Sequence, residues 1–191
     1  MKKEFLENPR PYTAREVLEL AGITEPPVDL SKVLAAFELA QSENFEFDQL
    51  ELSGSIEWTA DRKSAKIWVN PIEAEVRQRF TLSHELGHLF LHMLPKHDKE
   101  GEADTFKDTP NKFHRDGSTS QVEREANQFA ARLLMPAPLV KEYAKNIADE
   151  NRTDDGKIGM SRNAYIEELA SIFNVSRQSM EIRLKNLRVI S

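Results

Sequence analysis

The sequence contains no cysteine. Disulfide bonds, a thiolate nucleophile and a cysteine-type zinc finger are therefore excluded, and any bound metal must be held by His, Asp or Glu. Long apolar runs are also missing, since nothing approaches the ~18 apolar residues of a membrane span. The N-terminal stretch MKKEFLENPR has no apolar segment behind its lysines, which excludes a secretory signal there. We expect a cytoplasmic protein without membrane contact.

Basic residues are also fewer than acidic ones. The 191 residues include 26 Lys and Arg against 32 Asp and Glu, for a net charge of −6. A chain-wide basic surface that grips nucleic acid is not expected at this balance. Hydrophobic residues make up 39% and charged residues 30%, which is typical of a folded globule. The length suits one ordinary domain with a small appendage.

Hydrophobic periodicity predicts a mostly helical α+β fold with one small sheet. Helices are predicted over 13–21, 30–37, 72–94, 121–134, 138–150, 162–173 and 177–188. The segments SGSIEWT and SAKIWVN alternate as strands do around a polar turn at 60–63. A weaker alternation involves Phe45, Phe47, Leu50 and Leu52.

Residues 95–121 differ from their surroundings. They carry 11 charged residues, two prolines, two glycines and almost no aliphatic side chains. This composition predicts a long, mobile surface loop inserted in a domain that spans 1–150. Residues 151–191 then form a smaller unit, in which two helices and a short turn resemble a helix-turn-helix.

His84-Glu85-Leu86-Gly87-His88 is an HExxH motif. On a helix its two histidines lie about 40° apart around the axis and about 6 Å apart along it, so both can bind one ion. Zinc binds imidazole well, and the glutamate beside the first histidine can activate a water molecule. The surrounding helix is apolar over most of its circumference, so its narrow polar stripe needs a partner. Two hydrogen-bonded core histidines are the alternative, and a metal explains the stripe better.

A catalytic zinc needs a third protein ligand. The metzincin spacing would require a histidine where Leu94 stands, so a carboxylate from residues 122–134 is needed. Glu123 lies at the margin of the buried face of that helix, whereas Glu125 faces solvent, so we select Glu123. A surface carboxylate near the helix N-terminus is the alternative role for Glu123. Asn127, one turn further on, is placed to support a ligand side chain.

His92 continues the helical spacing by another four residues. It lies about 12 Å beyond His84 along the helix axis, which is too far for one tetrahedral ion to bridge. We expect His92 to have a supporting or structural role.

The segments RFTLSHELGHLFLH and EREANQFAARLLMP together resemble the ImmA/IrrE family of zinc metallopeptidases. The C-terminal segment LASIFNVSRQSMEIRLKNL fits the same family, and the resemblance covers roughly residues 55–190. It implies a zincin-like fold with His84, His88 and Glu123 as zinc ligands and Glu85 as general base. Characterised members act as anti-repressors that cut a helix-turn-helix transcriptional repressor, which implies such a protein substrate here.

Two other functions compete with peptide hydrolysis. Residues 162–191 hold five basic against three acidic residues, so this segment is the one candidate for contact with DNA. Alternatively, the chain is a partner-binding regulator in which the metal is structural.

The sequence offers candidates for two further parts of a peptidase site. The strand near Ile67 to Val69 is a candidate for pairing with an extended substrate. The candidates for an additional oxyanion donor are Tyr143, Tyr165, His92 and His114.

Overall fold

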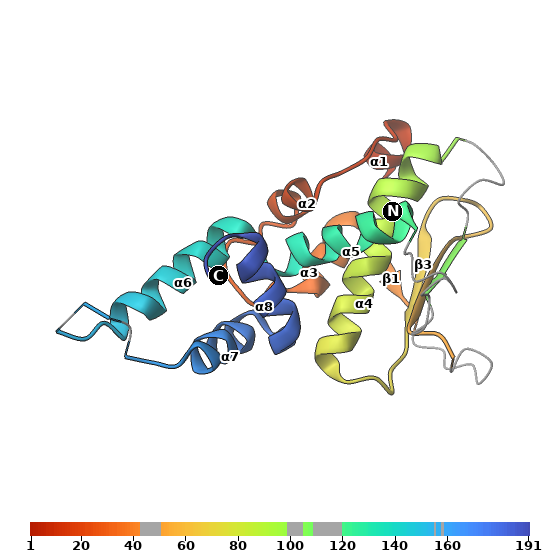
Figure 1. The fold of residues 1–191 in the computed structure, drawn as a ribbon. Helices are drawn as coiled ribbons and strands as arrows, with labels where there is room; N and C mark the ends of the chain where they lie inside the picture. Colours follow the sequence, from red (N-terminus) through yellow and green to blue (C-terminus); the bar gives the residue numbers. More distant parts are fainter. Residues whose placement is uncertain (43–50, 99–104, 109–119, 155, 158) are drawn as a thin grey trace.

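The computed structural model describes residues 1–42, 51–98, 105–108, 120–154, 156–157 and 159–191. The expected alternation at Phe45 and Phe47 and the candidate donor His114 lie outside these residues. The described chain is a mostly helical α+β fold with one small sheet, as its sequence predicts. Figure 1 shows the sheet on one side of the molecule and the C-terminal helices on the other, with two long helices between them.

The described helices are α1 (Lys3–Glu7), α2 (Ala14–Leu20), α3 (Leu30–Phe37), α4 (Glu75–His88), α5 (Gln121–Leu134), α6 (Ala137–Glu150), α7 (Arg162–Phe173) and α8 (Arg177–Asn186). Most of them begin after a side chain that accepts a backbone N–H of the first turn. These capping residues are Thr13, Asp29, Ser120, Ser161 and Ser176. These caps define where the helices begin, and the predicted helix boundaries agree with the observed ones to within a few residues, except at α4.

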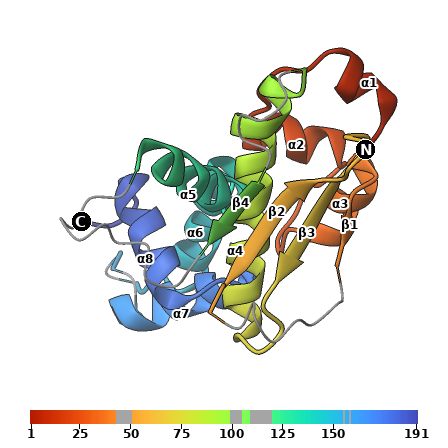
Figure 2. The same ribbon diagram turned by 90° about the vertical axis from the view of Figure 1, so that its right-hand side faces the viewer.

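The strands are β1 (Ala40–Gln41), β2 (Gly54–Trp58), β3 (Ala65–Val69) and β4 (Thr105–Asp108), in the spatial order β1-β3-β2-β4. The predicted hairpin is confirmed: β2 and β3 are antiparallel, with Ile56 opposite Ile67. Both isoleucines are fully buried. Figure 2 shows the sheet in front of α4, which therefore lies between the sheet and the remaining helices.

The strand β4 corrects the expectation of a continuous loop over 95–121. It pairs antiparallel with β2, and Phe106 lies opposite Ile56. Four residues with the sequence TFKD are too few and too polar to show a strand pattern, so this pairing depends on the exposed edge of β2. The candidate substrate strand is corrected as well. Pairing to β1 at Lys66 and Ile67 and to β2 places β3 in the sheet interior.

Helix α4 is shorter than the predicted 72–94. It begins at Glu75, because the Asn70 side chain accepts the backbone N–H of Ile72 and forms a turn there. The α-helical pattern ends at His88 and continues as a π-turn, η2 (Leu89–Met93), and a 3-10 turn, η3 (Leu94–Lys96). The proline that follows Leu94 has no N–H to donate, which favours this end of the regular helix.

One buried apolar cluster runs from Phe5 to Leu184 and includes both the sheet and the C-terminal helices. The turn between α7 and α8 is fastened to α4: Arg79 Nε donates to the Asn174 carbonyl oxygen at 3.2 Å. The division into 1–150 and 151–191 stays a prediction. Within the described ranges, no helix is long and apolar enough to cross a bilayer.

Candidate metal centre

The centre of the site is the C-terminal half of α4. Eight consecutive residues, 81–88, are buried there, as expected for a helix that is apolar almost all round. This burial holds the two motif histidines in place, with 3% of His84 and 1% of His88 exposed. Their Nε2 atoms lie 2.9 Å apart.

Glu123 reaches the two histidines from α5. Its Oε2 lies 3.1 Å from Nε2 of His84 and 3.6 Å from Nε2 of His88. The three ligand atoms all lie within 4.8 Å of one another, so they can hold a single metal ion. Glu125 instead has a side chain that is 42% exposed. The prediction from the helical period is therefore confirmed: Glu123 faces the histidines and Glu125 faces solvent.

The outer nitrogens of both imidazoles are held by other side chains. Nδ1 of His84 lies 3.1 Å from Oδ1 of Asn127, and Nδ1 of His88 lies 3.2 Å from Nδ1 of His92. In turn, Nε2 of His92 lies 3.0 Å from Oε2 of Glu125. The sequence did not predict the contact between His92 and Glu125, because the π-turn after His88 moves His92 away from the position that the regular helical period gives it.

When Nε2 of each ligand histidine donates its lone pair to a metal, these contacts determine which ring nitrogen carries the proton. His84 then carries its proton on Nδ1 and donates it to the Asn127 oxygen. His88 likewise donates from Nδ1 to Nδ1 of His92, which leaves the His92 proton on Nε2 to be donated to Glu125. All the bonds are consistent with a single set of tautomers, in which both Nε2 atoms are available to a metal.

We expect His92→Phe to weaken metal binding by about 10–100-fold, because loss of a partner that orients a ligand histidine has that effect. Titration against a chromophoric chelator measures it. His97→Phe is the matched control, since His97 contacts the Arg62 carbonyl oxygen and Trp58 rather than the cluster. Equal loss in the two variants would contradict the orienting role of His92.

Gly87 explains how α5 comes close enough for Glu123 to reach the histidines. A Cβ atom at this position would lie 3.0 Å from Cα of Ala126 and 3.2 Å from Cβ of Phe129. Both distances are tighter than ordinary van der Waals contact, so the two helix backbones would have to separate. A glycine inside a helix costs about 1 kcal/mol relative to alanine, which is a sign that it serves packing.

Gly87→Ala is therefore expected to weaken metal binding and to lower the free energy of unfolding. Overpacking costs about 1–3 kcal/mol, and the higher helix propensity of alanine offsets at most about 1 kcal/mol of this. Urea unfolding and chelator competition measure the two effects. Ser171→Ala, at an exposed position of α7, should slightly stabilise the protein. A Gly87→Ala protein as stable as that control, with unchanged metal affinity, would contradict this account of α5.

The motif glutamate Glu85 is fully buried beside the cluster. The chain leaves room for its carboxylate where β2 begins: a Cβ atom on Gly54 would lie 2.5 Å from Cγ2 of Thr81 and 3.1 Å from Oε1 of Glu85. Any side chain at position 54 would thus displace Thr81 and press on Glu85. On the other side, the ring of Phe106 stacks on that of His88, with centroids 4.2 Å apart and planes 12° apart. The strand β4 therefore borders the site.

Burial lowers the pKa of His88 from 6.5 to about 4, and this outweighs the hydrogen bond that the imidazole donates to Glu123, which raises the pKa. His88 is consequently neutral at physiological pH. A neutral imidazole is the form that binds metals.

This pKa predicts how the stability of the metal-free protein changes with pH. The unfolded chain takes up a proton on this imidazole below about pH 6.5, whereas the folded chain does so only near pH 4. The free energy of unfolding should thus fall as the pH drops from 6.5 to 4, by at most about 3 kcal/mol from this group. Urea unfolding across this range measures the slope. His88→Leu should have a shallower slope, and identical slopes would contradict the prediction.

Among the described residues, the candidate oxyanion donors do not gather at the cluster. The Tyr165 hydroxyl donates to the Ala144 carbonyl oxygen at 2.8 Å, and Tyr143 packs edge-on against Phe173. Both tyrosines therefore belong to the packing of α6 against α7. His92 lies behind His88, as described above.

A buried helix that presents two histidines and a glutamate, completed by a carboxylate from the next helix, is the arrangement of an HExxH metallopeptidase. The family comparison agrees. Residues 41–185 match the model of the IrrE N-terminal-like domain, Peptidase_M78. The chain belongs to this metallopeptidase family.

A curated relative is the radiation response metalloprotease IrrE of Deinococcus radiodurans. It is 25% identical over 113 residues, which cover 59% of this chain and 31% of the relative. The match thus spans about a third of the length of that protein.

Proposed function

We propose that the protein is a zinc-dependent endopeptidase that hydrolyses a peptide bond of a protein substrate. The observation that carries this proposal is the convergence of His84, His88 and Glu123 beside the buried carboxylate of Glu85. Two imidazoles and one carboxylate form a donor set that suits zinc and leaves a coordination position for water. Tetrahedral zinc with bonds of about 2.0–2.1 Å places neighbouring ligand atoms about 3.3 Å apart. The observed distances of 2.9, 3.1 and 3.6 Å fit that shell.

Three residues of the chain, Glu85, Asn127 and His92, have distinct roles in the proposed hydrolysis. Bound zinc supplies a Lewis acid that polarises the scissile carbonyl and makes water more acidic. Glu85 accepts the proton of the attacking water and passes it to the leaving amine, as general base and then general acid. Asn127 and His92 keep the ligand imidazoles in the orientation and tautomer that this requires.

An extended substrate backbone is best accommodated by β4. Within the described residues this strand pairs only with β2, so it is an edge of the sheet. Its Phe106 contacts His88, which places that edge beside the metal ligands. Peptides commonly bind enzymes by adding a strand to such an edge. This location replaces the candidate strand at Ile67 to Val69.

The proposed substrate is a helix-turn-helix transcriptional repressor, and the proposed role is that of a cytoplasmic anti-repressor. Membership of the IrrE N-terminal-like family and the resemblance to the ImmA/IrrE peptidases support this proposal. The test incubates the zinc-loaded protein with helix-turn-helix repressors of its own organism, beginning with any that is encoded beside its gene, and follows cleavage by mass spectrometry. Cleavage at one position, absent in Glu85→Gln, is expected. An intact repressor in both reactions would contradict the choice of substrate.

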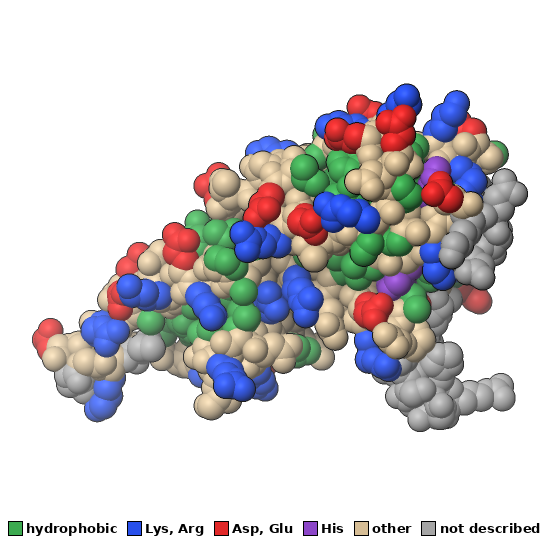
Figure 3. Space-filling model, turned by 90° about the horizontal axis from the view of Figure 1, so that it is seen from above, with side chains coloured by type: hydrophobic (Ala, Val, Ile, Leu, Met, Phe, Trp, Pro, Cys, Tyr) green, Lys and Arg blue, Asp and Glu red, His purple; other side chains and the backbone are tan. Residues whose placement is uncertain are grey.

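DNA contact through 162–191 is less well supported. Arg177 lies 3.7 Å from Glu167, and both Lys185 and Arg162 lie near Glu181, at 2.9 and 3.6 Å. Three of the five basic side chains therefore already face carboxylates. Figure 3 shows basic and acidic side chains interspersed over the face that it presents. Salt-dependent retention on DNA at low ionic strength would favour the DNA-binding alternative.

A further inference from the structure

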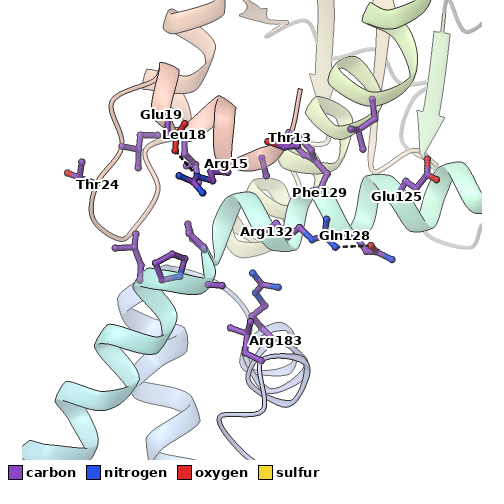
Figure 4. A pocket seen from close by; sticks show the side chains of 18 residues that line it. Thr13, Arg15, Leu18, Glu19, Thr24, Glu125, Gln128, Phe129, Arg132 and Arg183 are labelled. Carbon is purple, nitrogen blue, oxygen red and sulfur yellow. Dashed lines mark hydrogen bonds and ion pairs between the residues drawn. The ribbon is translucent and has the colours of Figure 1, made fainter. Parts of the chain in front are cut away.

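A groove separates α2 from the C-terminal helices, and its lining includes none of the three metal ligands. It has a volume of about 1060 Å³ and lies between α2, α5, the start of α6 and α8. Figure 4 shows α2 on one side of it and α8 on the other, with α5 between them. Much of its lining is apolar: Leu18, Ile23, Leu91, Phe129, Pro138 and Leu187.

Two guanidinium groups face this apolar lining. Figure 4 shows the Arg183 side chain on α8 directed toward α5, which carries Arg132. Arg183 Nε donates to the Met135 carbonyl oxygen at 2.9 Å, and Arg132 donates to Oε1 of Gln128 at 3.3 Å. These partners are neutral. Within the part of the chain that the structure describes, neither arginine forms an ion pair with a carboxylate.

The two carboxylates of the groove have other partners. Glu19 accepts from Nε of Arg15 at 2.7 Å. Glu125 accepts from Nε2 of Gln121 at 2.8 Å and lies 3.0 Å from Nε2 of His92. The positive charge of Arg132 and Arg183 is thus left without compensation in the groove.

Arg183 is half-buried, whereas Arg132 is exposed, and an uncompensated charge in a half-buried position is unfavourable for the isolated protein. Burial lowers the pKa of the Arg183 guanidinium, and repulsion from Arg132 lowers it further. A carboxylate between the two arginines would remove this repulsion and could accept charge-assisted hydrogen bonds from both. The groove therefore combines an apolar surface with a site for an anion.

We propose that this groove binds an acidic amphipathic helix of a protein partner. The apolar side chains of the helix would lie against the floor formed by Leu18, Phe129 and Leu187. An Asp or Glu at its edge would bind Arg132 and Arg183. This surface provides a docking function beyond peptide hydrolysis and does not depend on it.

The shape of the groove favours a helix over a single alkyl chain with an acidic head. The groove is partly open to solvent. An alkyl chain bound there would keep part of its apolar surface in water, whereas an amphipathic helix presents its polar face to the open side.

The test measures binding by fluorescence anisotropy with a labelled helical peptide of about 18 residues. It consists of Leu, Ala and Glu, with Leu at helical spacing, and a second peptide carries Lys in place of every Glu. We expect the acidic peptide to bind saturably and the basic one at least about tenfold more weakly. Arg132→Glu with Arg183→Glu should lower affinity for the acidic peptide at least about tenfold and reverse the preference. Lys66→Glu with Lys145→Glu has the same charge change at exposed positions outside the groove and should leave binding unchanged.

Three results would overturn the proposal. The first is equal binding of both peptides or no effect of the arginine reversal. The second is saturable binding of decanoate without binding of the acidic peptide, which would identify an alkyl carboxylate as the ligand. The third is a dimer in sedimentation that the arginine reversal abolishes, which would assign the groove to a second copy of this chain. Peptide affinity in Glu85→Gln should equal that of the wild type, so this test stands apart from the hydrolytic proposal.

Discussion

Glu85→Gln is expected to lower kcat for peptide hydrolysis by about 10³-fold, because general acid–base catalysis contributes about 10²–10⁴-fold. Glutamine has the same size as glutamate, so it fills the same fully buried position without a new cavity. It cannot accept the proton of the attacking water. Initial rates with a quenched-fluorescence peptide derived from the cleaved substrate measure the loss.

Metal content separates this effect from damage to the site. Glu85→Gln should bind the same amount of zinc as the wild type, since Glu85 is not among the three clustered ligands. Glu142→Gln, at an exposed position of α6, is the matched control and should retain full activity. A Glu85→Gln protein with more than about a tenth of the wild-type rate would refute Glu85 as the proton carrier.

Glu123→Ala is expected to weaken metal binding more than 100-fold, because it removes a ligand, and removal of a mere supporting contact already costs about 10–100-fold. Two imidazoles would then remain, and tetrahedral sites normally require more. The protein should also lose the stabilisation that excess metal gives the wild type, which is about 2.7 kcal/mol for each 100-fold of affinity. Calorimetric titration and thermal unfolding with and without zinc measure these effects.

Glu125→Ala is the informative comparison. Glu125 lies two residues along the same helix and touches His92 rather than the ligand atoms. Its loss should reduce affinity by about tenfold, as for other outer contacts of a metal site. Comparable losses in the two variants would indicate that α5 as a whole, and not the Glu123 carboxylate, holds the ion.

The choice between these two carboxylates shows how far the sequence alone leads. Residues 123 and 125 differ by about 200° around a helix, so the apolar face of α5 was enough to direct Glu123 inward. The HExxH spacing likewise placed His84 and His88 on one side of α4. Both inferences rest on regular helical geometry, which is a local property of the chain.

Features that depend on contacts between distant segments were not predictable in this way. The strand at 105–108 forms because the edge of β2 is available to it, and its own residues carry little pattern. The π-turn after His88 departs from the helical period, so the contact of His92 with Glu125 could not be computed from spacing. Gly87 is visible in the sequence as part of the motif. The reason for a glycine there is the close approach of the Ala126 backbone, which the sequence does not show.

The origin of the ligands on two different helices has a consequence for a chain without cysteine. An ion held by His88 and Glu123 would act as a covalent-like cross-link that closes a loop of roughly 35 residues, and a disulfide across such a loop stabilises a protein by about 3–4 kcal/mol. The loop includes β4, whose edge borders the site. The metal would thus provide the reversible cross-link that disulfide bonds provide in other proteins, and a chelator would remove it.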